Sequence, residues 1–89
     1  MNAQFIRVDN KAVSDIFQIK DNPFHVNDEI DLEYWDTITD EETDEDKSVI
    51  DDNFKGIFRI VSIRHEVRLQ HVITTYYEHG IINILIEPV

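Results

Sequence analysis

Apolar and polar residues alternate along most of this chain with a period of two, the pattern of half-buried β-strands. The clearest case is "EIDLEYW" (29–35), where Ile30, Leu32 and Tyr34 fall on one face and the intervening residues on the other. No window carries a sustained apolar stripe of 3.6-residue period with helix caps, and "NKAVSDIF" (10–17) could form one turn at most. The pattern predicts an all-β protein.

Strand-like segments and short turns together define the expected architecture. The turn signals are "DNPF" (21–24) and "EHGI" (78–81), where Gly80 can take a positive φ. Short turns between about six strands favour a small antiparallel β-barrel or sandwich of five to seven strands, forming one domain over residues 1–89. The expected strands are residues 4–8, 14–20, 29–35, 55–69, 71–78 and 81–88, with Pro88 ending the last one.

The longest expected strand, "KGIFRIVSIRHEVRL" (55–69), changes its apolar face near Ile60–Val61. This change indicates either a β-bulge at that point or a first half that is buried on both faces. Because burying an apolar side chain contributes roughly 1.5–3 kcal/mol, Ile63→Asp is expected to unfold the protein. The predicted core is Phe17, Ile19, Ile30, Leu32, Phe58, Ile60, Val61, Ile63, Ile82, Ile84 and Ile86.

Charge is concentrated in one segment of the chain. The net charge is −11, and "DTITDEETDEDKSVIDD" (36–52) holds nine acids and one lysine, which leaves −3 for the remainder. This composition predicts a long acidic loop, residues 36–53, inserted into a nearly neutral β domain. Such a charge balance does not attract phosphate, so nucleic-acid binding is not expected.

Catalytic and cofactor signatures are absent from the sequence. There is no cysteine, which excludes disulfides, zinc ribbons, iron–sulfur clusters and thiol nucleophiles. His65 shares a strand face with apolar residues and is expected to be partly buried, whereas Glu66 must point to the opposite face. Gly56 and Gly80 are too few to build a phosphate-binding loop. We therefore expect no enzyme activity, no catalytic residue, no cofactor and no metal site; the four histidines, none in metal-ligand spacing, are His25, His65, His71 and His79.

A calcium site is one alternative for the acidic segment. Asp40, Glu42 and Asp44 match positions one, three and five of an EF-hand loop, and Asp51 matches position twelve. Glu45 occupies position six, where the EF-hand requires glycine, and no flanking helices are predicted. A dense run of acids produces this degree of match by chance.

Two further alternatives concern what the acidic loop contacts. Carboxylates spaced along a surface can imitate a phosphate backbone or attract a basic protein. The other alternative is a solvated insertion that only aids solubility. The candidate partner-binding residues are Asp40, Glu41, Glu42, Asp44, Glu45, Asp46, Asp51 and Asp52.

Two stretches of the chain, "DNPFHVNDEIDL" (21–32) and "GIFRIVSIRHEV" (56–67), resemble segments of small β-barrel domains of contractile-tail phage hub and baseplate proteins. "DNPFHVNDEIDL" (21–32) is similar to their turn-then-strand segment, although Asn27 stands where glycine is usual. "GIFRIVSIRHEV" (56–67) followed by "VITTYYE" (72–78) is similar to their alternating strand and threonine-rich return strand. The resemblance implies a scaffold role without catalytic residues.

A second set of segments, beginning with "FQIKDNPFHVNDEIDLEYWD" (17–36), resembles the ASCH group of PUA-like domains. The other two segments are "FKGIFRIVSI" (54–63) and "GIINILIE" (80–87). The preceding helix of that group is reduced to one turn at most, and Gln18 stands where an acid is usual. This resemblance implies an RNA-binding module; binding would then be carried by Arg59, Arg64, Arg68, Tyr76 or Tyr77.

The functional expectation is a non-enzymatic structural or assembly protein that binds other proteins, most readily a phage tail or baseplate component. The alternatives are an acidic inhibitor or adaptor that docks a basic protein surface, and a PUA-like RNA-binding module. Partners are expected among particle subunits or basic host proteins, and a protein of this size could also form oligomers. With no signal-peptide pattern and no membrane span, the expected location is the cytoplasm or a virus particle assembled there.

Overall fold

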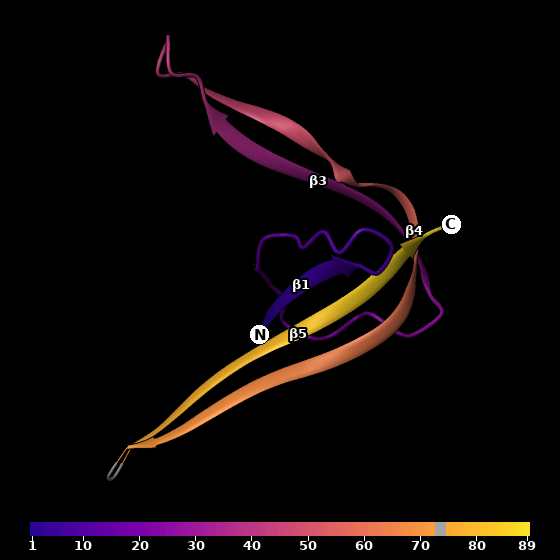
Figure 1. Cartoon of the computed structure of the whole chain (residues 1–89), viewed down its shortest axis with the longest axis vertical. Helices are drawn as coiled ribbons and strands as arrows, with labels where there is room; N and C mark the ends of the chain where they lie inside the picture. Colours follow the sequence, from indigo (N-terminus) through magenta and orange to yellow (C-terminus); the bar gives the residue numbers. More distant parts are fainter. Residues whose placement is uncertain (73–74) are drawn as a thin grey trace.

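The structure, a computed structural model, describes the backbone of residues 1–72 and 75–89 and the side chains of residues 1–68 and 80–89. It confirms the all-β prediction, because strands make up 67% of the chain and the described residues contain no helix. The strands are β1 (Asn2–Arg7), β2 (Phe17–Gln18), β3 (Glu29–Thr39), β4 (Asp46–Val72) and β5 (Thr75–Pro88) (Figure 1).

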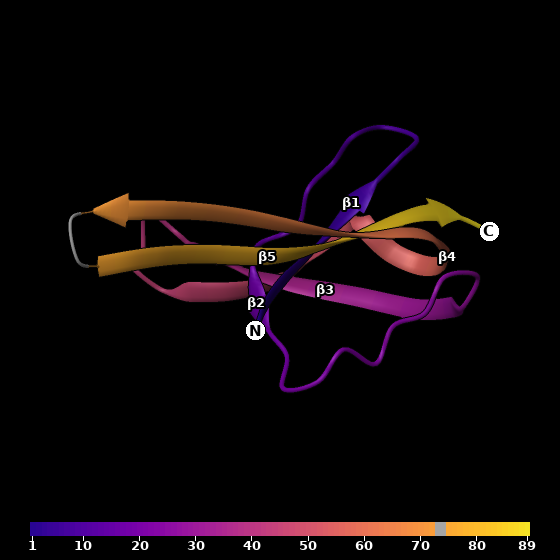
Figure 2. The ribbon, with the colours of Figure 1, turned by 90° about the horizontal axis from the view of Figure 1, so that it is seen from below.

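The five strands form one curled sheet, a half-barrel, in the order β2-β1-β5-β4-β3 (Figure 2). The expected antiparallel pairing holds for β1–β2, β3–β4 and β4–β5. It is wrong for β1 and β5, which run parallel, with Phe5 opposite Ile84. The parallel pair arises because β5 returns along β1 only after the chain has passed through β2, β3 and β4, so no hairpin connects the two strands.

Strand β4 belongs to two hairpins. Its first part pairs with β3 and its last part with β5, and both hairpins extend beyond the body of the molecule (Figure 1). We call residues 35–50 the acidic arm, and residues 67–72 with 75–80 the second arm. The two arms leave opposite ends of the body, so that the molecule measures 49 × 38 × 24 Å.

The predicted acidic loop, residues 36–53, is wrong. Residues 36–39 belong to β3 and residues 46–53 to β4, so only residues 40–45 form a connection. The connection is closed by bonds from Asp40 N to Glu45 O (2.9 Å) and from Asp44 N to Asp40 O (2.8 Å). Carboxylates do not prevent strand formation here, because on a solvated two-stranded ribbon they remain in water.

The C-terminal strands also differ from expectation. The turn predicted at residues 78–81 is wrong, because Gly80 lies inside β5 and pairs with Val67. The predicted strand 71–78 covers the end of β4, residues 73–74 outside the described chain, and the start of β5. The bulge alternative near Ile60–Val61 is confirmed by a register shift between Ile60 and Ser62.

The N-terminal strands are shorter than expected. The predicted strand 4–8 corresponds to β1, while the predicted strand 14–20 reduces to the two residues of β2. A separate bridge joins Ile6 to Val13, just before the predicted strand. Ser14 bonds to Phe5 of β1 twice: its backbone N donates to Phe5 O at 2.9 Å, and its Oγ accepts the Phe5 N–H at 2.9 Å.

The core lies on the concave face of the sheet. Five of the predicted core residues are buried, namely Phe58, Ile60, Ile82, Ile84 and Ile86. Phe17, Ile19, Ile30, Leu32 and Ile63 are partly buried against them, and Val61 is half-buried at the bulge. Four further residues are buried that were not in the predicted core, namely Ala3, Phe5, Phe54 and Ile81.

Phe54 enters the core because of an irregularity in β4. Between Glu33 and Trp35 of β3, the partner strand moves from Lys55 to Ile50, so β4 contains extra residues at this point. The extra length redirects the strand, and Phe54 becomes 1% exposed with its ring centroid 6.2 Å from that of Tyr34. This bulge marks the boundary between the body and the acidic arm.

Candidate functional site

The acidic arm gathers most of the predicted partner-binding residues. Asp40, Glu41, Glu42, Asp44, Glu45 and Asp46 all lie at its tip. The one cation within the arm is Lys47, whose Nζ lies 3.6 Å from Asp40 Oδ2. Asp51 and Asp52 are separated from this group, because they belong to the bulge at the base of the arm.

The calcium alternative does not match this geometry. It requires Asp51 to join the carboxylates of the turn, whereas Asp51 lies in β4 and accepts a hydrogen bond from Asn53 N at 2.9 Å. At the tip, Asp40 Oδ1 already accepts the Glu42 N–H at 2.9 Å. Within the part of the chain that the structure describes, no group of three or more histidines or acids is placed to hold a metal ion.

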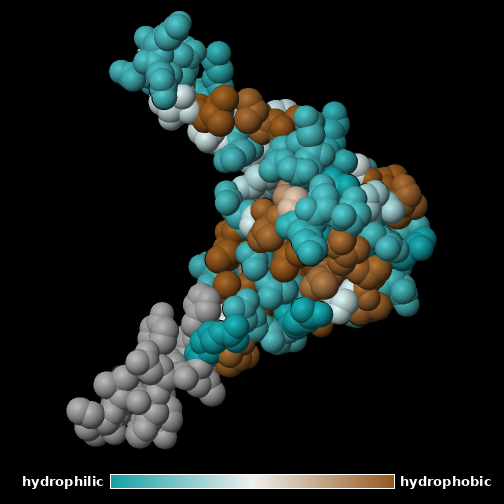
Figure 3. Space-filling model, in the orientation of Figure 1, coloured by the Kyte–Doolittle hydropathy of each residue, from teal (hydrophilic) through white to brown (hydrophobic). Residues whose placement is uncertain are grey.

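Apolar side chains accompany the carboxylates on both faces of the arm. Trp35 lies opposite Ile50 on one face and is 56% exposed. On the other face Ile38, 49% exposed, neighbours Val49. Figure 3 shows the consequence, a hydrophobic band between the hydrophilic tip and the body. The arm therefore combines apolar contact area with a high density of negative charge.

Polar contacts fix the base of the acidic arm to the N-terminal part of the chain. The hydroxyl of Tyr34 donates to Asp15 Oδ2 at 2.5 Å, and Arg7 Nη1 donates to Asn53 O at 2.9 Å. The bond to Asp15, with smaller contributions from desolvation and nearby carboxylates, raises the pKa of Tyr34 to about 12. These contacts set the direction in which the arm leaves the body.

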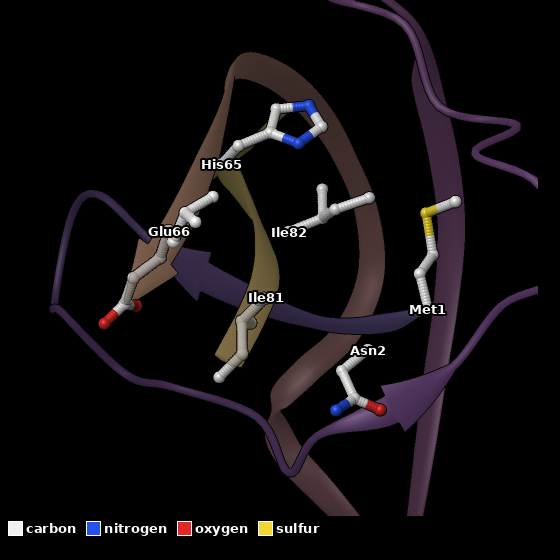
Figure 4. Close-up of a pocket in the computed structure, with 8 residues that line it drawn as sticks. Met1, Asn2, His65, Glu66, Ile81 and Ile82 are labelled. Carbon is white, nitrogen blue, oxygen red and sulfur yellow. The ribbon is translucent and has the colours of Figure 1, made fainter. Parts of the chain in front are cut away.

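A pocket of about 230 Å³ lies where the second arm meets the body, and Figure 4 shows its lining. His65, Ile82 and Met1 lie on one side of the sheet, while Glu66 and Ile81 point to the other. The expected partial burial of His65 is wrong, because its side chain is exposed beyond the edge of the core. The pocket is thus an apolar hollow with a single imidazole.

Glu66 takes part in a row of polar contacts on the convex face. Gln4 Nε2 donates to Asn83 Oδ1 at 2.7 Å, and Asn83 Nδ2 donates to Glu66 Oε2 at 3.2 Å. Arg68 Nη2 lies 3.2 Å from Glu66 Oε1 and completes the row. These bonds satisfy the buried Asn83 and connect β1, β5 and β4, which is a structural role.

Two of the three arginines proposed for RNA binding are paired with carboxylates. Arg59 is paired with Glu29 at 3.2 Å and Arg68 with Glu66, while Arg64 is exposed. The side chains of Tyr76 and Tyr77 lie outside the described residues.

Comparison of the chain with protein-family models, with curated proteins and with solved structures finds no match. Across the described residues, no helix has the length and apolar character needed to cross a membrane.

Proposed function

We propose that this protein is a non-enzymatic binding module that joins other proteins in an assembly, with its arms as the contact elements. The observation that carries the proposal is the pair of arms that leave a small body (Figure 1). Their apolar side chains Trp35, Ile38 and Val67 are 56%, 49% and 48% exposed. Exposed apolar groups on projecting elements are typical of interaction surfaces.

The size of the body supports this proposal. The buried core is confined to the body, and the acidic arm contributes none of its side chains to it. A short chain that extends much of its length away from its own core gains little stability from doing so, whereas a partner could bury that surface. The resemblance of most of residues 21–86 to phage hub and baseplate domains makes a tail or baseplate subunit the assembly that we favour, acting in the cytoplasm or in the particle.

A second candidate function is electrostatic docking as an inhibitor or adaptor. The six carboxylates at the arm tip, with Lys47 as the one neighbouring cation, favour a basic protein surface. RNA binding has less support, because Arg59 and Arg68 are already paired with carboxylates.

Removing the acidic arm tests both candidates. In the shortened variant, Asn-Gly replaces residues 37–48 and connects Asp36 to Val49, which face each other across the ribbon. The intact protein and the shortened variant are immobilised, and lysate of the native source is passed over each, with washes at low and then high salt.

We expect the intact protein to retain partners that the shortened variant loses. Particle subunits that remain bound at high salt would support the assembly function, since apolar contacts are not screened. A basic protein released by salt would support the inhibitor or adaptor instead. Equal capture by both forms would show that residues 37–48 of the acidic arm are not the contact element.

A further inference from the structure

Strand β3 is an edge of the sheet, and its outer side is open. Among the strands that the structure describes, it pairs with β4 on one side and with none on the other. Among the described residues, the one hydrogen bond that meets its open side is local, from Thr37 N to Asp36 Oδ1 at 2.8 Å. An open row of backbone donors and acceptors is a ready template for a further strand.

The register identifies the residues whose backbone faces the open side. The bond from Asp40 N to Glu45 O places Ile38 and Asp36 in hydrogen-bonded pairs with β4, because such pairs alternate along an antiparallel ladder. The bond from Ile60 N to Asp28 O does the same for Ile30 and Leu32. The outward residues, all with exposed side chains, are therefore Glu29, Asp31, Glu33, Trp35, Thr37 and Thr39.

We propose that the open edge of β3 accepts an extended strand of a basic protein, in which lysine or arginine occupies alternate positions. The inference rests on the proposed binding function and specifies its mode. Backbone bonds to the outward residues would supply affinity, while cations beside Glu29, Asp31 and Glu33 would select the partner. Trp35 provides an apolar contact at the next outward position along the strand.

Charge decides against a second copy of this chain as the occupant. In-register parallel pairing of two β3 edges, or antiparallel pairing centred on Asp31, would bring carboxylates beside carboxylates, which destabilises cross-strand pairs. The chain as a whole carries −11, and it still carries −3 outside residues 36–52. A cationic strand is the complementary partner, and the same carboxylates protect the edge from self-association.

The first probe is a synthetic peptide in which lysine alternates with threonine, long enough to span β3. Two matched peptides serve as references, one with glutamate in place of lysine and one with N-methylated backbone amides. Affinity is measured by calorimetry, and amide hydrogen exchange at Trp35 and Thr39 by NMR. We expect the lysine peptide to bind and to slow exchange at both amides, and both references to bind at least about tenfold more weakly.

Two proline variants place the contact on one edge of the arm. Thr37→Pro removes an outward amide of β3, and Ser48→Pro removes the amide directly across the ribbon on the outward side of β4. Thr37→Pro is expected to lower the affinity for the lysine peptide by about tenfold or more, because the variant loses a backbone donor and hinders the close approach of the peptide. Ser48→Pro is expected to keep the wild-type affinity. Circular dichroism confirms that both variants fold.

Three results would reject strand addition: equal weakening by the two prolines, full binding of the N-methylated peptide, or no binding of the lysine peptide. None of them affects the proposed binding function, which is tested separately by whether the intact protein captures partners from the lysate. Asp31→Lys combined with Glu33→Lys is expected to reverse the preference, so that the glutamate peptide binds more tightly than the lysine peptide.

Discussion

Side chains at the centre of the core belong to β4 and β5, and Ile84 is fully buried there. We expect Ile84→Ala to lower the free energy of unfolding by about 2–5 kcal/mol, because the substitution removes buried methyl groups and leaves a cavity. Ile57→Ala is the matched control; Ile57 is 53% exposed, so its change should be small. Urea unfolding monitored by circular dichroism measures both, and equal losses would contradict the assignment of the concave face as the core.

The hydroxyl of Tyr34 makes the stability of the protein depend on pH. Its bond to Asp15 raises the pKa from 10.0 to about 12, so the native state holds this proton more tightly than the unfolded chain does. The stability from this bond is therefore complete below pH 10 and is lost as the pH rises through about 12. NMR titration of the Tyr34 ring should give this raised value, and Asp15→Asn should return the pKa toward 10.0; an unchanged value in the variant would exclude Asp15 as the cause.

Within β4, Gly56 has a φ of 123°, a backbone conformation that side-chain-bearing residues rarely adopt. An added Cβ would meet no atom within 4 Å, so the cost of substitution is conformational rather than steric. Gly56→Ala should lower the free energy of unfolding by about 1–3 kcal/mol. Gly80→Ala is the control, because its nearest contact would be Glu66 O at 4.0 Å. Thermal or urea unfolding compares the two, and a larger loss at Gly80 would disagree with the structure.

Strand elements were predictable where alternation was regular, and less so where irregular backbone intervenes. The period of two in residues 29–35 and the change of face near Ile60 were sufficient to predict β3 and the bulge in β4. The turn predicted at Gly80 was wrong, because a glycine in the sequence shows that a positive φ is possible but not that the fold adopts it. In this fold it is Gly56 that has a positive φ. The position of Phe54 depends on the extra residues of β4 at the bulge, and these can be recognised only from the register in which β4 pairs with β3.

The largest error in element type was the prediction of a loop where the structure has the acidic arm. The density of carboxylates led to a loop prediction although the segment also contains the strand formers Thr37, Ile38, Val49 and Ile50. The structure places these residues in a paired ribbon. Six of the eight candidate carboxylates lie together at the tip, whereas Asp51 and Asp52 lie at the base of the arm, and the role of all eight in binding stays a prediction. The open edge of β3 could not have been identified, since strand order depends on which strands meet in the folded sheet.

The whole molecule is strongly anionic, and its stability should depend on ionic strength. Raising sodium chloride from about 0.01 M to about 1 M shortens the Debye length from about 30 Å to about 3 Å. The melting temperature should rise over this range, because repulsion among the clustered carboxylates is screened. The variant with Asn-Gly in place of residues 37–48, which lacks six acids and one lysine, should show a smaller rise. Equal rises in the two proteins would locate the repulsion elsewhere.

The parallel pairing of β1 with β5 has a consequence for how the protein is made. Residues 2–7 of β1 pair in parallel with residues 81–86 of β5, so nearly the whole chain separates the two strands in sequence. Contacts of this separation slow folding, because a long loop must close before they form. During translation the side of β1 that pairs with β5 stays unpaired until Ile86 has emerged from the ribosome. In that interval the exposed strand is open to wrong pairing, and a chaperone that covers short apolar segments would raise the yield of native protein.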